Sequence, residues 1–168
     1  MAPRATLDIL TGWLSGARTV LLVGVGNVGR GDDGAGPLVA ESAKRWSSDR
    51  FKVMNVEEAL GRLLPDAIDL RPSHIIVVDA ALVGGPPGTV KLMRMEDVES
   101  VRFSSTHDLP VKVAVGLLAS QTGAEAILIG IQPETTKLRG EISESVRTAC
   151  ARLSESLVGS LRSAGVVT

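Results

Sequence analysis

The sequence predicts an α/β protein, a three-layer α/β/α sandwich around a five-stranded, mostly parallel twisted sheet with one antiparallel strand. Three observations predict this class. Segments with strand-like and helix-like hydrophobic patterns alternate along the chain. The run HIIVVD at 74–79 is almost continuously β-branched or apolar, as in strands buried on both faces. The chain has 168 residues, 44% of them apolar, so we expect a single domain over 1–168 with one sizeable core.

The elements follow from local patterns, in order along the chain. The amino-terminal residues 1–19 alternate charged and apolar residues as a small amphipathic helix does. Apolar runs predict strands at residues 18–26, 51–56, 74–79, 89–95 and 126–131. Helical periodicity predicts further helices at residues 36–46, 59–70, 109–119 and 141–162. The segment 95–108 is expected to be a loop.

The strand at 89–95 is expected to break the parallel pattern. The turn-rich segment ALVGGPPG at 81–88 separates it from the preceding strand and leaves no room for a crossover helix. It should therefore run antiparallel, at or near an edge of the sheet. The loops after the parallel strands should open onto one rim, where active sites of such sheets tend to lie.

Composition excludes several classes of function. The formal net charge is −1 and the chain has two Trp, two Phe and no Tyr, so neither nucleic acid nor an anionic membrane is an expected partner. No apolar run approaches the roughly 18 residues that cross a bilayer, so we expect a soluble protein. The presence of one cysteine alone predicts a cytoplasmic location. Cys150 is the only cysteine, which excludes an internal disulfide, and it lies on the apolar face of the last helix as a buried residue would. His74 begins a strand and is expected to be structural.

The glycine-rich segment GVGNVGRGDDGAG at 24–36 follows the first predicted strand. Its GxGxxG spacing is that of a dinucleotide-binding turn. Two features count against this function. The predicted helix begins only at Gly36, too late for its amino terminus to face a pyrophosphate, and Asp32 and Asp33 bring negative charge near the phosphates. A dinucleotide-binding enzyme is therefore the least favoured alternative.

Asp33, Asp79 and His107 are the candidate site residues. They come from three separate segments, each expected at a strand or helix end on one rim. Two carboxylates and one imidazole suit a divalent ion such as nickel or zinc, and three protein ligands leave positions open for water or substrate. Each also has a structural interpretation: Asp33 can cap the next helix, Asp79 can cap a turn, and His107 can be a surface residue or hydrogen-bonded near a helix.

In four motifs the sequence resembles the hydrogenase maturation endopeptidases. The match covers nearly the whole chain, with the motifs in the family's order. The sequences of these motifs are most similar to those of the branch that serves formate-linked, hydrogen-evolving hydrogenases. The motifs are GVGN at 24–27 with DDGAGP at 32–37, RP at 71–72 through VDA at 78–80, TH at 106–107 with Pro110, and GIQP at 130–133.

This resemblance implies a function, a partner and a ligand set. The family removes a short C-terminal extension from the large subunit of nickel-iron hydrogenases after nickel insertion, so the implied partner is that precursor. The metal-binding positions fall on Asp33, Asp79 and His107, which then form the catalytic set of an aspartic-type, metal-binding endopeptidase. The nickel is carried by the substrate, so no stably bound cofactor is expected, and the chain is expected to act as a monomer. Asp32 is expected to position the loop or cap the helix.

The expected reaction is metal-assisted peptide hydrolysis. The precursor's nickel anchors the tail and orients the scissile carbonyl, and water attacks with the ion or a carboxylate assisting. Ser104 and Ser105 lie near His107 in the sequence, but no acid that would orient this histidine is identifiable. A serine nucleophile is therefore not expected.

One segment departs from the family pattern. Many relatives have Gly-Gly or Ala-Gly after the second strand, whereas this chain has Glu57 and Glu58 there. Two carboxylates can change how the substrate tail docks; alternatively they are solvated residues that suit the start of a helix. A nickel-protein binding module that has lost hydrolysis through this change is the second alternative function.

Overall fold

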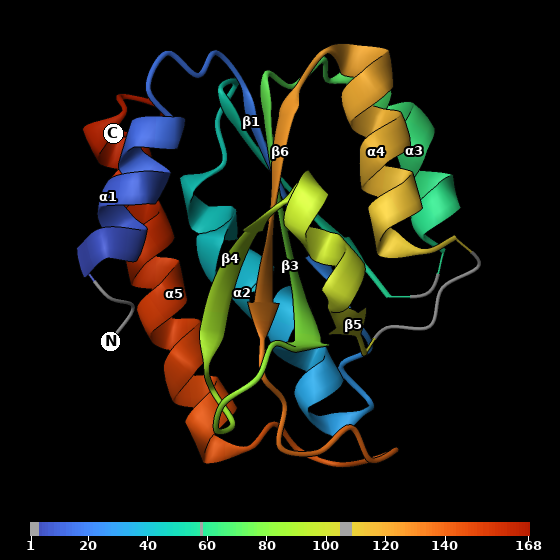
Figure 1. Cartoon of the computed structure of the whole chain (residues 1–168). Coiled ribbons are helices and arrows are strands. Elements are labelled where there is room, and N and C mark those ends of the chain that lie inside the picture. Colours follow the sequence, from blue (N-terminus) through green and yellow to red (C-terminus); the bar gives the residue numbers. More distant parts are fainter. Residues whose placement is uncertain (1–3, 58, 105–108) are drawn as a thin grey trace.

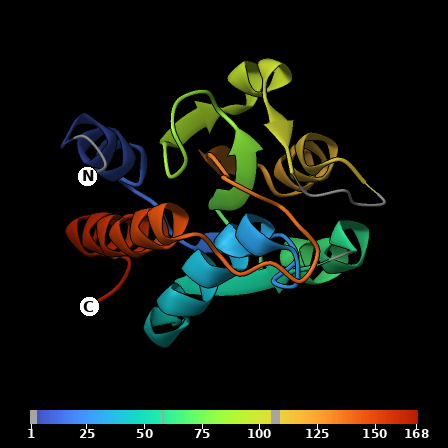
Figure 2. The same ribbon diagram turned by 90° about the horizontal axis from the view of Figure 1, so that it is seen from below.

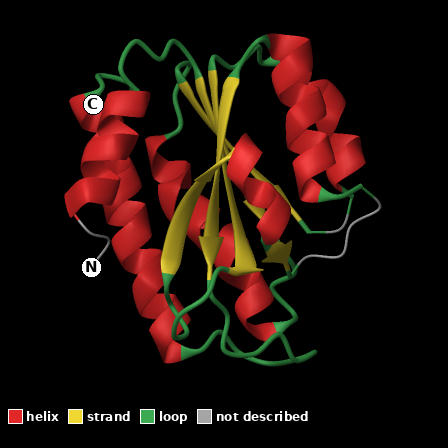
Figure 3. Cartoon of the chain, viewed as in Figure 1, coloured by secondary structure: helices red, strands yellow, loops and turns green. Residues whose placement is uncertain are grey.

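The computed structural model describes residues 4–57, 59–104 and 109–168 and confirms the three-layer α/β/α sandwich (Figure 1). The strands are β1 Val20–Val25, β2 Phe51–Val56, β3 His74–Leu82, β4 Val90–Arg94, β5 Arg102–Phe103 and β6 Glu125–Ile131. The α-helices are α1 Arg4–Trp13, α2 Ala35–Ala43, α3 Leu60–Asp69, α4 Val111–Thr122 and α5 Glu144–Ser163. Three 3-10 helices are η1 Gly31–Gly34, η2 Lys44–Trp46 and η3 Met95–Ser100. Helices lie outside and strands between them (Figure 3).

The sheet order is β2-β1-β3-β6-β4 in the described part of the chain. The first four of these strands are parallel; Val20 of β1 lies opposite Phe51 of β2 on one side and His74 of β3 on the other. β4 runs antiparallel to β6, with Val90 opposite Ile131. The predicted antiparallel strand at the edge of the sheet is therefore confirmed.

A short strand that the sequence analysis did not expect lengthens β3. β5 lies in the segment predicted to be a loop and pairs antiparallel with the end of β3, Ala81 opposite Phe103. β3 therefore continues to Leu82, and Asp79 lies inside the strand rather than at its end. The same segment also contains η3. Two-residue pairing depends on the neighbouring strand, so a local hydrophobic pattern cannot predict it.

The apolar run of β1 is continuous because both faces of the sheet are covered. Neighbouring residues of a strand point to opposite faces, so Val20 and Leu22 join one core while Leu21 and Val23 join the other. α1, α2 and α5 pack on the first face, and α3 and α4 on the second. No described helix is long and apolar enough to span a membrane.

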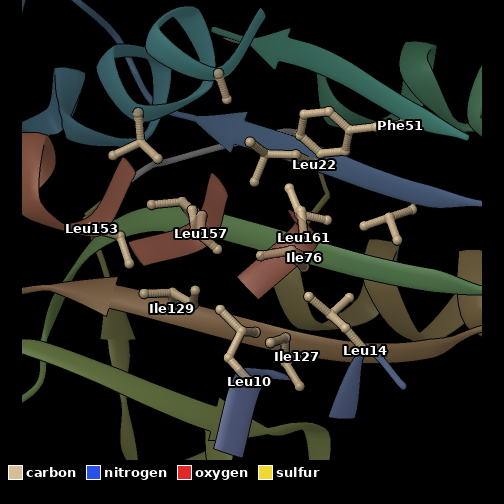
Figure 4. Packing of buried hydrophobic residues seen from close by; sticks show 14 of the residues in the cluster. Leu10, Leu14, Leu22, Phe51, Ile76, Ile127, Ile129, Leu153, Leu157 and Leu161 are labelled. Atoms are coloured by element: carbon tan, nitrogen blue, oxygen red, sulfur yellow. The ribbon is translucent and has the colours of Figure 1, made fainter. Parts of the chain in front are cut away.

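Figure 4 shows the first of these cores from close by. Leu22 of β1 and Ile76 of β3 lie against Leu157 and Leu161 of α5, and all four side chains are at most 1% exposed. Burying a leucine or isoleucine side chain contributes about 1.5–3 kcal/mol. This core holds α5 against the sheet. The position of α5 in turn sets where the loop between β6 and α5 ends.

The direction of the chain path reverses between β1 and β3. The chain leaves β1 through η1 and α2 on one face, and it enters β3 from α3 on the opposite face. In α/β proteins, ligands bind beyond the carboxyl ends of the strands at such a reversal. Figure 2 looks at the molecule from below, and the orange segment after β6 passes beside the blue start of α2.

Candidate active site

Glycines in the segment after β1 let α2 pack directly on the sheet. A Cβ added to Gly24 would lie 2.6 Å from the Cβ of Ala40, and one added to Gly36 would collide with the backbones of β1 and β3. Gly26 has φ +140°, and a side chain there would collide with the backbone of Asp33. Only glycine fits where two backbones approach this closely. These contacts bring η1, with its two aspartates, onto the carboxyl ends of β1 and β3.

The backbone amides of this segment are already engaged. They donate hydrogen bonds inside the protein, at 2.8 to 3.2 Å. The phosphates of a dinucleotide would need these donors. The structure therefore disfavours the dinucleotide-binding alternative. The residues whose amides donate are Gly26, Asn27, Gly29, Arg30, Gly31, Asp32 and Asp33.

Asp32 ties the segment after β1 to the segment after β6. Its fully buried carboxylate accepts hydrogen bonds from the backbone N–H groups of Glu134 (2.8 Å), Thr135 (3.1 Å) and Ser143 (2.7 Å). It also accepts the hydroxyl of Ser143 at 2.9 Å, and Ser143 is the N-cap of α5. These charge-assisted bonds use about the full accepting capacity of a carboxylate. Asp32 therefore positions a loop, as expected, but the loop belongs to the far end of the chain.

Asp33 holds the turn that opens the site. The residue is 4% exposed, and its Oδ2 accepts the backbone N–H of Asn27 at 2.9 Å. The N-cap of α2 is Gly34, and no side chain caps this helix, so the capping alternative for Asp33 is wrong. The carboxylate instead closes the turn back onto the end of β1.

Asp79 lies inside β3 and is fully buried. It pairs in register with Gly130 of β6. Alternation along the strand places its side chain on the same face as Ile75 and Val77, the face covered by α3 and α4. Asp33 and Asp79 therefore belong to two segments that meet at one edge of the sheet.

His107, the third candidate, lies outside the described residues. The described chain before it ends at Ser104, whose backbone N–H donates to the carbonyl of Ala80 at 2.8 Å, one residue beyond Asp79. Among the described residues no group of three or more His, Cys, Asp or Glu is placed to hold a metal ion. The three-residue ligand set stays a prediction.

Gln132 holds the loop after β3, a function that the sequence analysis missed. Its side-chain Oε1 accepts the backbone N–H groups of Val83 (2.9 Å) and Gly84 (3.2 Å). Its backbone carbonyl accepts the N–H of Gly88 at 2.8 Å. The motif GIQP at 130–133 therefore joins the loop after β6 to the loop between β3 and β4. The sequence predicts that the turn after the last strand lies at the rim, but no local pattern identifies the loop to which Gln132 binds.

His74 and Cys150 are structural, as expected. The Nδ1 of His74 lies 3.0 Å from the Ser73 hydroxyl, and its ring packs edge-on against Trp13 with centroids 4.7 Å apart. Burial lowers the pKa of His74. Burial and, to a lesser degree, the negative charge of Asp32 raise the pKa of the Cys150 thiol to about 12. Such a thiol is neutral near pH 7 and is no nucleophile.

Only one of the two glutamates that differ from the family pattern after β2 lies in the described part of the chain. Glu57 is exposed in the turn that follows β2, and Glu58 lies outside the described residues. Asn55 of β2 lies opposite Gly24 of β1, beside the glycine-rich segment. An effect of the two glutamates on docking of a substrate stays a prediction.

This chain is similar to hydrogenase maturation proteases in sequence and in structure. The family model HycI, hydrogenase maturation protease, matches residues 48–160. The hydrogenase 3 maturation protease of Escherichia coli K12 is 29% identical over 141 residues, which cover 84% of this chain and 90% of that protein.

Solved structures agree with this likeness. The crystal structure of a nickel-iron hydrogenase maturation protease HycI from Thermococcus kodakarensis KOD1 matches with a TM-score of 0.82 and 30% identity, over 92% of this chain and 99% of that chain. The solution structure of an endopeptidase HycI from Escherichia coli matches with a TM-score of 0.72 and 27% identity, over 84% of this chain and 90% of that chain.

Proposed function

This chain belongs to the hydrogenase maturation protease family, and we propose that it is the endopeptidase that removes the C-terminal extension from the large-subunit precursor of a nickel-iron hydrogenase. The observation that carries this function is the agreement of family, relatives and fold over one domain. The chain is therefore a protease, and the question that its structure raises is how it recognises the precursor.

The proposed recognition element is the nickel that the precursor already holds. Asp33, Asp79 and His107 would bind it as ligands. Two observations support the carboxylates: both residues are buried, and both lie beside the carboxyl end of β1. Carboxylate and imidazole donors without thiolates suit a borderline divalent ion with modest affinity. Such a site would borrow the substrate's ion, so we propose no resident cofactor.

Hydrolysis in this proposal follows from orientation. With the precursor's nickel bound at the rim, the scissile carbonyl is held at a fixed place relative to the same carboxylates. Water attacks this carbonyl with the ion or one of these carboxylates assisting, and the proton that the water loses passes to the amine that leaves as the peptide bond breaks. In this sense the enzyme would be a metal-binding, aspartic-type endopeptidase. The locked segments around Asp32 and Gln132 support the rigid frame that such orientation needs.

The burial of both aspartates adds a step to the proposal. Asp33 is 4% exposed and Asp79 is 0% exposed, so the carboxylates do not face open solvent. A nickel ion carried by another protein reaches them only if the covering segments move when the precursor binds.

The experiment that tests the function compares two forms of the precursor. Purified protein is incubated with nickel-loaded and with nickel-free large-subunit precursor, and mass spectrometry follows the loss of the extension. Only the loaded form should be shortened. Binding of the loaded precursor without shortening would favour the non-hydrolytic binding module, and equal shortening of both forms would contradict recognition of nickel. A titration with NADH, followed by fluorescence, tests the dinucleotide alternative and should show no binding.

A cytoplasmic location and a monomeric state complete the proposal. The support for a reducing compartment is that the sequence has one cysteine and so can form no internal disulfide. Fractionation of cells that express the protein checks the compartment, and sedimentation of the purified protein checks the oligomeric state.

A further inference from the structure

β4 is the last strand of the sheet in the described part of the chain, so one of its sides is open. In an antiparallel pair, residues that bond to the partner strand alternate with residues whose backbone groups point away from it. The backbone N–H of Gln132 donates to the carbonyl of Thr89 at 2.8 Å, which sets the phase of this alternation. The residues that turn their backbone N–H and C=O groups to the open side are Val90, Leu92 and Arg94.

Two hollows follow this open side. One of about 740 Å³ lies between the start of β4 and the start of α5, with polar lining from Thr89, Thr148 and Arg152. Another of about 400 Å³ lies between α1 and β4, where Leu92 and Arg94 line it. Together with the strand they form a groove, which we name the β4 groove.

The β4 groove starts at the same end of the parallel strands as the candidate active site, on the face covered by α5, and leads toward the other end of these strands. Val90, at the start of β4, lies opposite Ile131, the last residue of β6, so the larger hollow opens at the edge that carries Asp33 and Asp79. Five residues of β4 then span about 17 Å toward the other edge of the sheet. A peptide that leaves the site past the end of β6 would reach the groove at Val90.

We infer that the C-terminal extension of the precursor binds in the β4 groove as an added strand. The inference depends on the proposed function. A strand edge offers alternating donors and acceptors, and an extended polypeptide backbone is what matches them. The chain before the scissile bond continues into the folded, nickel-carrying part of the precursor, so the extension is the segment with a free end that can lie along β4.

A second copy of this chain is a poorer occupant of the same edge. Lys91 and Arg94 are both exposed on β4, and two antiparallel copies would bring these cations close together. Charged residues on an edge strand are a common protection against such self-pairing. A flexible peptide avoids this repulsion because it does not bring a second β4.

One pair of variants separates the backbone of β4 from its side chains. Leu92→Pro removes an outward N–H group and leaves the hydrogen bonds to β6, whereas Leu92→Ala shortens the side chain and keeps the N–H. For cleavage of nickel-loaded precursor, Leu92→Pro should raise KM about five- to tenfold with kcat nearly unchanged, and Leu92→Ala should change KM less than about twofold. An unchanged KM in a folded Leu92→Pro protein would overturn the inference. Failure of the unmodified protein to cleave would instead overturn the proposed function.

A second measurement needs no variant of the protein. A synthetic peptide with the sequence of the extension is added to the protein, and amide hydrogen exchange is followed by NMR. Protection should rise at Val90, Leu92 and Arg94 and stay unchanged at Lys91 and Met93, which face β6. The same peptide with alternate amides methylated should give no protection. Protection that needs no peptide and grows with protein concentration would show pairing of two copies, and would overturn the inference.

Discussion

Polar groups differ between the two ends of the parallel strands. At the end where these strands begin, neutral donors and the guanidinium of Arg50 hold distant segments of the chain together. The guanidinium of Arg50 donates to the carbonyls of Ala17 (2.8 Å), Arg18 (3.1 Å) and Gly165 (2.6 Å). The Ser73 hydroxyl accepts from the backbone N–H of Arg18 at 2.9 Å.

Near the end where the parallel strands finish, three aspartates are buried. Asp32, Asp33 and Asp79 are each at most 4% exposed. Burying a carboxylate costs free energy that hydrogen bonds must offset, and Asp32 gains four of them from the loop before α5. The difference teaches that stability and activity are separable here. Substitutions where the strands begin should lower stability alone, and those where they end should lower activity.

The largest expected effect is on cleavage, after the change Asp79→Asn or Asp33→Asn. The amide keeps the shape of the carboxylate but loses the charge that binds the substrate's nickel. Cleavage of loaded precursor should fall at least about 100-fold. The rate is measured by mass spectrometry of the released extension. The matched control is Asp66→Asn, at an exposed position on α3, and it should cleave normally. Normal cleavage by the Asp79 variant would remove Asp79 from the ligand set.

Asp32→Ala should lower stability and loosen the loop before α5. It leaves the backbone N–H groups of Glu134, Thr135 and Ser143 without their acceptor, so the free energy of unfolding should fall by about 3 kcal/mol. Urea denaturation measures this change. Hydrogen exchange should become faster between residues 134 and 143. The control Glu134→Gln changes an exposed side chain and should leave stability within about 0.5 kcal/mol. Unaltered exchange in the Asp32 variant would mean that other contacts hold this loop.

Arg50→Met should lower stability and spare activity. The change removes three hydrogen bonds to backbone carbonyls but keeps most of the aliphatic stem. The free energy of unfolding should fall by about 1–2 kcal/mol, with kcat/KM for the precursor unchanged. A loss of kcat/KM at a temperature where this variant is fully folded would contradict the division between the two ends of the parallel strands.

The smallest expected effect concerns the pH dependence of stability. The pKa of His74 is lowered from 6.5, chiefly by burial, so the unfolded chain takes up this proton first as the pH falls. The free energy of unfolding should therefore decrease from about pH 6.5 down to the lowered pKa of the folded state. Urea denaturation at several pH values measures this slope, and His74→Gln should flatten it. An equal slope in both proteins would mean that other groups dominate the acid response.

Much of the fold could be predicted from local sequence patterns. The run HIIVVD identified a doubly covered strand, and the absence of room for a helix before 89–95 identified the antiparallel edge strand. β5 and the true end of β3 could not be predicted, because two-residue pairing depends on a partner far along the chain. The helix after the glycine-rich segment begins at Ala35 and is preceded by η1, so Asp32 and Asp33 lie in a helical turn rather than in an extended loop.

The site was predictable in position but not in detail. Residue type and strand order place Asp33 and Asp79 at one edge of the sheet. The sequence could not show that the neighbouring Asp32 serves a distant loop, since its partners lie around residues 134–143. For the same reason, the function of Gln132 as a clamp on another loop was missed. Long-range hydrogen bonds leave no periodic signal in a single chain.

The most direct measurement of the central claim is X-ray absorption at the nickel edge. Loaded precursor is measured alone and after rapid mixing with the protease, frozen before the extension is lost. We expect the nickel to gain oxygen and imidazole nitrogen ligands in the mixture, and to gain no carboxylate ligand from Asp79 in the Asp79→Asn protein. A nickel spectrum that stays the same in a mixture that goes on to lose the extension would contradict the account.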